Sequence, residues 1–140
     1  SDAKLFKKLA ALGEKLVALH LLKSPDLNPP ACRFEGDGNN RVEKTGLRYA
    51  DDEERVYINA AQHFAPVPAD IWAYQIGAYQ VCEKWLKDRR ERRLVFDDII
   101  AYCRIVTALG RTLELQQQID GLYAEVEKET VTMPGEENPC

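Results

Sequence analysis

Apolar residues recur at steps of three and four positions over residues 4–22, and this spacing predicts an amphipathic helix. The apolar positions include Leu5, Phe6, Leu9, Leu12, Leu16, Leu19 and Leu22, with lysine and glutamate side chains between them. The helix should end before residues 24–30, because this segment contains Pro25, Pro29 and Pro30, and proline cannot continue a helix.

The period changes after residue 31. Apolar and polar side chains alternate over residues 56–59, as they do in a half-buried strand. A second strand is expected over residues 42–49, where the alternation holds only if Gly46 is an extra residue in a bulge. A glycine- and asparagine-rich turn at 36–40 and an acidic corner at 51–54 flank these segments, so we expect two or three short antiparallel strands.

Helices are predicted again in the second half of the chain. We expect a short strand near Trp72 and then a helix from about Tyr79 to Arg90. A long helix is predicted over residues 97–126, where apolar residues return at helical spacing behind a capping Asp97 or Asp98. Gly110 within it suggests close packing against another element.

Together these elements predict an α+β fold, with two long helices and a shorter one packed on a small antiparallel sheet. We assign residues 1–126 to a single domain. Residues 127–140 carry proline, glycine and mostly acidic charge, and we expect them to form a flexible tail.

The length of 140 residues fits one domain, and 45% apolar residues can form a real core. The formal charge is −4, and no apolar stretch approaches the roughly 20 residues of a membrane-spanning helix. The chain begins Ser1-Asp2-Ala3 without methionine, which we interpret as a cut within a longer polypeptide.

The four cysteines, Cys32, Cys82, Cys103 and Cys140, are too far apart in sequence to suggest a zinc site. They are expected to be reduced thiols, mostly buried, in a cytoplasmic protein. No metal or other cofactor is expected in this chain.

The sharpest charge feature is the segment 84–93, which contains six basic and two acidic residues. Such a cluster within an acidic protein can attract phosphate. A run of this kind is also typical of a solvated helix end, whose arginines pair with nearby acids. The segment alone therefore leaves both interpretations open.

The sequence contains no catalytic constellation. Asn28-Pro29-Pro30 is similar to the substrate-binding motif of amino-methyltransferases, but Ala31 follows it in place of an aromatic residue. No phosphate-binding loop, dinucleotide-binding loop or nucleophile motif is present. We therefore expect a chain without catalytic activity of its own.

Several motifs nevertheless suggest a family. They are Val56-Tyr57-Ile58-Asn59, Gln62-His63-Phe64, Ile76-Gly77-Ala78-Tyr79-Gln80, Lys84-Trp85-Leu86-Lys87-Asp88-Arg89 and Ile105-Val106-Thr107-Ala108-Leu109. In order and spacing they resemble the C-terminal specificity domain of type ISP restriction-modification enzymes and related large adenine-specific methyltransferases. The resemblance covers most of the chain except the tail.

The resemblance implies a target-recognition domain that binds duplex DNA sequence-specifically and is not catalytic. The other domains of the same polypeptide would be its partners. Among them, an adenine-N6 methyltransferase would bind S-adenosylmethionine, so that cofactor is expected outside this chain. The whole enzyme would serve bacterial defence in the cytoplasm.

The resemblance also implies roles for particular residues. The expected phosphate contacts are Lys84, Lys87, Arg89, Arg90, Arg92 and Arg93. Candidates for contacts in a DNA groove are Arg41, Lys44 and Arg48, with Gln75, Asn39 and Asn40 as weaker ones.

An alternative function stays open. The chain could be a structural coupling module that docks on the methyltransferase domain and contacts DNA only in the full-length enzyme. The overall charge of −4 favours this alternative, because an isolated duplex-binding domain is commonly basic.

Overall fold

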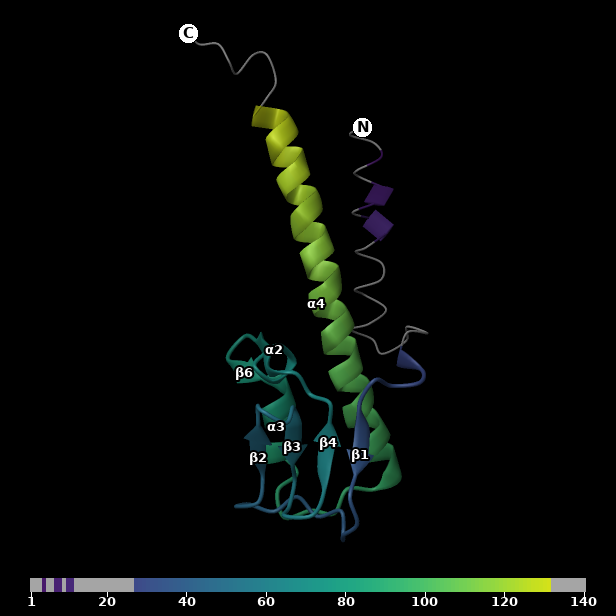
Figure 1. The fold of residues 1–140 in the computed structure, drawn as a ribbon, viewed down its shortest axis with the longest axis vertical. Helices are drawn as coiled ribbons and strands as arrows, with labels where there is room; N and C mark the ends of the chain where they lie inside the picture. Colours follow the sequence, from purple (N-terminus) through teal and green to yellow (C-terminus); the bar gives the residue numbers. More distant parts are fainter. Residues whose placement is uncertain (1–3, 5–6, 9, 12–26, 132–140) are drawn as a thin grey trace.

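The computed structural model describes residues 4, 7–8, 10–11 and 27–131 (Figure 1). Most of the helix expected over residues 4–22 lies outside the described residues, although Lys4, Lys7, Lys8, Ala10 and Ala11 are helical. The remaining elements, in chain order, are β1 (Arg33–Glu35), β2 (Arg48–Ala50), β3 (Arg55–Tyr57), β4 (His63–Ala65), α2 (Ala69–Trp72), β5 (Gln75–Ile76), β6 (Tyr79–Gln80), α3 (Val81–Lys87) and α4 (Phe96–Val131).

The first four strands form one antiparallel sheet in the order β1-β4-β3-β2. Its register places Phe34, Phe64, Val56 and Tyr49 in one row across the sheet. Helices α3 and α4 lie on one side of this sheet (Figure 1). The small antiparallel sheet and the long C-terminal helix confirm the predicted α+β fold.

The core lies between this row and the helices. Phe64 and Val56 are fully buried, as is Tyr102 of α4. The ring centroids of Tyr102 and Phe64 are 4.4 Å apart, and the Tyr102 hydroxyl donates a hydrogen bond of 3.1 Å to the carbonyl of Cys82 in α3. Tyr102 therefore joins the sheet, α3 and α4.

Helix α4 begins at Phe96, slightly earlier than predicted, so Asp97 and Asp98 lie in its first turn and neither is the N-cap residue. The Asp98 carboxylate still caps the helix start, because it accepts a hydrogen bond of 3.0 Å from the backbone N–H of Val95. A Cβ atom placed at Gly110 would lie 3.1 Å from Cδ1 of Ile71, so the glycine allows α2 to approach. The helix continues to Val131, past the boundary predicted at residue 126, and residues 132–140 lie outside the described residues.

The strand predicted near Trp72 was wrong, whereas the helix predicted from about Tyr79 to Arg90 is present with shorter bounds. A helix, α2, occupies the position of the strand expected near Trp72, because Pro68 at its N-cap has a φ of −59° that suits a helix start. The predicted helix is α3, which begins at Val81 and ends at Lys87, since Tyr79 pairs with Ile76 in a hairpin.

The bulged strand predicted over residues 42–49 was also wrong. The ordered strand there is only β2, and residues 44–46 form a turn. The backbone of Val42 and Glu43 bonds instead to Arg92 and Ile58, which are distant in sequence. The strand predicted over residues 56–59 corresponds to β3, whereas strands β1 and β4 were not predicted.

Among the described residues, no helix combines the length and apolar character needed to span a membrane.

Candidate nucleic-acid interface

Three segments meet at one end of the four-stranded sheet, which we call the loop end: residues 36–48, 58–62 and 88–95. Backbone hydrogen bonds join them directly. The N–H of Val42 donates to the carbonyl of Arg92 at 2.9 Å, and that of Leu94 donates to Asn40 at 2.7 Å. The N–H of Glu43 donates to Ile58 at 2.8 Å. Figure 1 shows these segments together below the strands.

Two buried amide side chains brace the loop end from inside. Gln62 is 2% exposed, and its Oε1 accepts hydrogen bonds from the Asn40 N–H at 2.8 Å and from Asn59 Nδ2 at 3.1 Å. Its Nε2 donates to Asn40 Oδ1 at 2.8 Å. Asn59 Nδ2 also donates to the carbonyl of Arg41 at 3.0 Å. These contacts fix the backbone that carries the basic residues.

Asn39 and Asn40, which the sequence suggested as weaker DNA contacts, make hydrogen bonds within the loop end. The Asn39 carboxamide oxygen accepts from the Arg41 N–H at 3.0 Å, and the Asn40 side chain accepts from Gln62. Both amide groups thus stabilise the turn in the free protein.

The structure brings most of the predicted basic residues to the loop end. Its segments contain seven basic residues against four acidic ones; the basic residues are Arg41, Lys44, Arg48, Arg89, Arg90, Arg92 and Arg93. Arg41 pairs with Glu91 at 2.9 Å. Lys44 and Arg93 are exposed and have no ion pair within the described residues. The net positive charge is therefore accessible to solvent.

The backbone itself holds two of these arginines. Nη2 of Arg92 donates to the carbonyl of Asp88 at 2.9 Å, and Nε of Arg90 donates to the carbonyl of Lys87 at 3.0 Å. Each guanidinium keeps further N–H groups for a ligand, because arginine carries five such donors.

The basic residues of α3, and Arg89 just after it, are engaged with neighbouring side chains. Lys84 contacts Asp88 at 2.7 Å, and this hydrogen bond holds the pKa of Asp88 below its ordinary value. Lys87 pairs with Glu83 at 3.4 Å. The Arg89 guanidinium lies 3.6 Å from the centre of the Trp85 ring and donates to the Trp85 carbonyl. Such pairing is typical of a solvated helix end, the second interpretation that the sequence left open for this segment.

Gln75 does not join the other candidates. It lies exposed on β5, in the hairpin beside α2, whereas the loop end follows the opposite end of α3.

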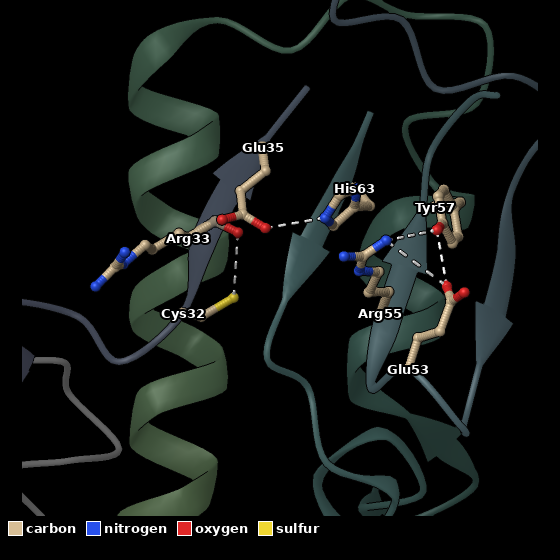
Figure 2. Close-up of polar contacts among 7 residues, drawn as sticks. All are labelled: Cys32, Arg33, Glu35, Glu53, Arg55, Tyr57 and His63. Carbon is tan, nitrogen blue, oxygen red and sulfur yellow. Dashed lines mark hydrogen bonds and ion pairs between the residues drawn. The ribbon is translucent and has the colours of Figure 1, made fainter. Parts of the chain in front are cut away.

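The outer face of the sheet carries a polar row that the sequence analysis missed. The register aligns Glu35, His63, Tyr57 and Arg48 across all four strands. Glu35 and His63 are in contact at 3.0 Å, and Figure 2 shows this pair bridging β1 and β4. The Arg48 guanidinium lies 4.1 Å from the centre of the Tyr57 ring.

Arg33 and Arg55 lie on the same outer face and were also missed. Arg55 donates to the Tyr57 hydroxyl at 3.1 Å, which in turn donates to Glu53 at 2.8 Å (Figure 2). Arg33 is exposed on β1. The strict alternation around Val56 places Arg55 and Tyr57 on the face opposite the core, so sequence periodicity could have identified Arg55.

Acidic residues gather at the opposite end of the sheet. Residues Asp51, Asp52, Glu53 and Glu54 form the connection between β2 and β3. Because β2 starts at the loop end and runs away from it, this connection is separated from the basic residues of the loop end by the full length of the strands. The sheet thus has a basic end and an acidic end.

The thiols and carboxylates offer no site of another kind within the part of the chain that the structure describes. Cys32, Cys82 and Cys103 are buried and free, in agreement with the prediction for them, whereas Cys140 lies outside the described residues. No group of three or more metal-binding side chains occurs among the residues searched.

Comparison with known proteins identifies one protein family. The family model of the type ISP C-terminal specificity domain matches residues 1–118. No curated protein matches significantly. No solved structure does so either. Since the family model covers most of the chain, the protein belongs to the type ISP C-terminal specificity domain family.

Proposed function

We propose that this chain is the sequence-specific DNA-binding, target-recognition domain of a restriction-modification enzyme that methylates adenine at N6. In this function the chain performs no chemistry. It binds duplex DNA, and the methyltransferase part of the same polypeptide binds S-adenosylmethionine and transfers the methyl group. The enzyme acts in the bacterial cytoplasm as part of a defence system.

The observation that carries the proposal is the grouping of basic residues at the loop end. Arg41, Lys44 and Arg48 are far in sequence from residues 89–93, yet the backbone pairing of residues 40–43 with 91–94 brings them together. The acidic corner lies at the other end of the sheet, away from where DNA phosphates would bind. This separation lets a chain of net charge −4 present a basic surface to DNA.

The two groups of basic residues have different roles in this proposal. Arg90, Arg92 and Arg93, together with Lys44, contact phosphates, because they lie at the loop end and keep donors free. Lys84 and Lys87 on α3, and Arg89 just after it, contribute less, since each would first have to leave an intramolecular partner. In this proposal Arg48 on the edge strand β2 and Arg41, which bridges to Arg93, make the contacts in a DNA groove.

A second candidate function is the coupling module, which docks on the methyltransferase domain and contacts DNA only in the full enzyme. The ion pairs along α3 favour it, because charges that are paired within the domain attract phosphate less strongly.

The salt dependence of binding to random duplex DNA tests the proposal. We expect log K to fall linearly with log salt concentration, with a slope of about 0.9 for each phosphate contacted. The triple variant Arg90→Ala, Arg92→Ala, Arg93→Ala should lower this slope by about 2 to 3. The double variant Lys84→Ala, Lys87→Ala is the matched control, and it should change the slope by less than one.

Circular dichroism of each variant must show a folded chain for the comparison to hold. If the folded wild-type chain binds no duplex even at low salt, the coupling module is the better function. Equal losses of slope in the triple and double variants would place the phosphate contacts on α3 as much as at the loop end.

A further inference from the structure

Two large apolar side chains are exposed beside the arginines of the loop end. Phe96 is 73% exposed and Val95 is 58% exposed. Both directly follow Arg92, Arg93 and Leu94 in the chain. Single exposed apolar residues are common on protein surfaces, but here two neighbours stand next to a basic cluster.

The backbone under these side chains is firmly held. Leu94 is 1% exposed in the core, and its N–H donates to Asn40 at 2.7 Å. The N–H of Val95 donates to Asp98, and the carbonyl of Val95 accepts the first hydrogen bond of α4, from Ile99 at 3.1 Å. Phe96 is therefore the first residue of a long helix and projects from a fixed position.

The charges around Phe96 indicate which part of DNA it would meet. Arginines precede it, whereas Asp97 and Asp98 follow it, and the Asp98 carboxylate already occupies the N–H group of Val95. These two carboxylates repel phosphate from the helix start itself. An uncharged base can lie against the phenyl ring while the arginines that precede Phe96 in the chain contact the DNA phosphates.

We propose that Phe96, supported by Val95, is an apolar wedge that inserts at a base step of the bound duplex. The charge complementarity of the adjacent arginines to the DNA backbone identifies duplex DNA as the occupant of this surface. Apolar side chains of other proteins enter base steps in this way and partly unstack them. The inference rests on the proposed function and adds an unstacking contact to it, one that would ease extrusion of a base for methylation.

A pair of duplexes tests the wedge without knowledge of the target sequence. One duplex is fully paired, and the other is identical except for a single mismatch, which lowers the cost of unstacking. We expect the wild-type chain to bind the mismatched duplex several-fold more tightly. Phe96→Ala should remove this preference and weaken binding to the mismatched duplex by about tenfold, the loss of one stacking contact.

The salt slope separates this contact from the phosphate contacts. Because a phenyl ring releases no counterions, Phe96→Ala should leave the slope unchanged, in contrast to the arginine variants. Phe96→Trp should retain the preference for the mismatched duplex. Tyr123→Ala is the matched control, since Tyr123 is another exposed aromatic residue of α4, at 58% exposure, and lies far from the loop end.

These experiments distinguish a failure of the wedge from a failure of the proposed DNA binding. If the wild-type chain binds DNA with a steep salt slope but Phe96→Ala equals wild type on both duplexes, the wedge is overturned and the proposed function stands. Phe96 would then belong to a surface for another protein domain. If the folded wild-type chain binds neither duplex, both the wedge and DNA binding by this chain are overturned.

Discussion

Among the single residues, buried polar groups position the basic surface. Gln62 and Asn59 direct their side-chain donors and acceptors to loop backbone and to each other, so no charge is needed inside the loop end. A buried amide that is fully hydrogen-bonded costs little to bury, whereas its removal leaves the partner groups unsatisfied. The rigidity of the interface therefore depends on residues that would never touch DNA.

Replacing Gln62 should reveal this dependence. We expect Gln62→Ala to lower the free energy of unfolding by about 2–3 kcal/mol, because the half-buried N–H of Asn40 and the buried amide of Asn59 lose this acceptor. Urea denaturation followed by circular dichroism measures the change. Gln75→Ala is the matched control and should change stability by less than about 0.5 kcal/mol, since Gln75 is exposed. A similar effect of both substitutions would contradict the bracing role.

A buried thiol should make stability fall at alkaline pH. Burial raises the pKa of Cys82 from 9.0 to about 12, so between these values the unfolded chain loses a proton that the folded chain keeps. The folded state then binds more protons, and stability decreases as the pH rises from about 9 towards 12. We expect Cys82→Ala to be less stable near neutrality but to show a shallower decline from about pH 8.5 to about 10.5 in urea titrations. Parallel declines would mean that other groups cause the loss.

Among the helices and strands, α4 connects different parts of the molecule. Its first turns form one wall of the core through Tyr102 and Val106, and Gly110 then admits the side chain of Ile71 from α2. Further along the helix, a Cβ atom placed at Gly121 would meet no atom of the residues that the structure describes within 4 Å. The two glycines of one helix therefore stand in opposite environments.

Substituting each glycine by alanine should distinguish these environments. We expect Gly121→Ala to raise the free energy of unfolding by about 0.5–1 kcal/mol, because alanine favours the helix and its Cβ would meet none of the described residues. Gly110→Ala should raise the free energy of unfolding clearly less, since its Cβ would lie 3.1 Å from Ile71 and push that side chain aside. Thermal unfolding followed by circular dichroism compares the two. An equal gain at both positions would show that the approach of α2 does not need the glycine.

Across the molecule as a whole, the four-stranded sheet separates a group of acidic residues from a group of basic ones. The acidic residues at 51–54 and the basic residues of the loop end lie at opposite ends of strands about 10 Å long. Charges over this distance are largely screened at physiological salt, where the Debye length is about 8 Å. The net charge of −4 thus says little about the local potential that DNA would meet.

Neutralising the acidic corner checks this argument. We expect Asp51→Asn with Asp52→Asn to change the affinity for duplex DNA by less than about twofold at about 0.15 M salt, because of this screening. At low salt the same double variant should bind more tightly than wild type, since the repulsion then extends further. Fluorescence anisotropy at the two salt concentrations measures both effects. A large gain at physiological salt would mean that the corner lies close to the bound DNA.

Local patterns along the chain were enough to predict the fold class, the long helix and the family. Residues 97–126 repeat their apolar positions over many turns, and Asp98 and Gly110 mark the helix start and a close approach. The basic segment 84–93 was equally visible as a run of residues. The motifs that suggested the family depend on residue order alone, and the family match confirms that prediction.

The grouping of the basic residues, in contrast, emerges only when the chain is folded. Arg41 and Arg93 face each other in an isolated bridge that joins segments about fifty residues apart, and no periodic pattern reveals such a pairing. Strands β1 and β4 were not predicted, so the sequence did not show that Arg33 lies on the outer face of a sheet. Long-range backbone hydrogen bonds, which local sequence does not encode, thus built the candidate interface.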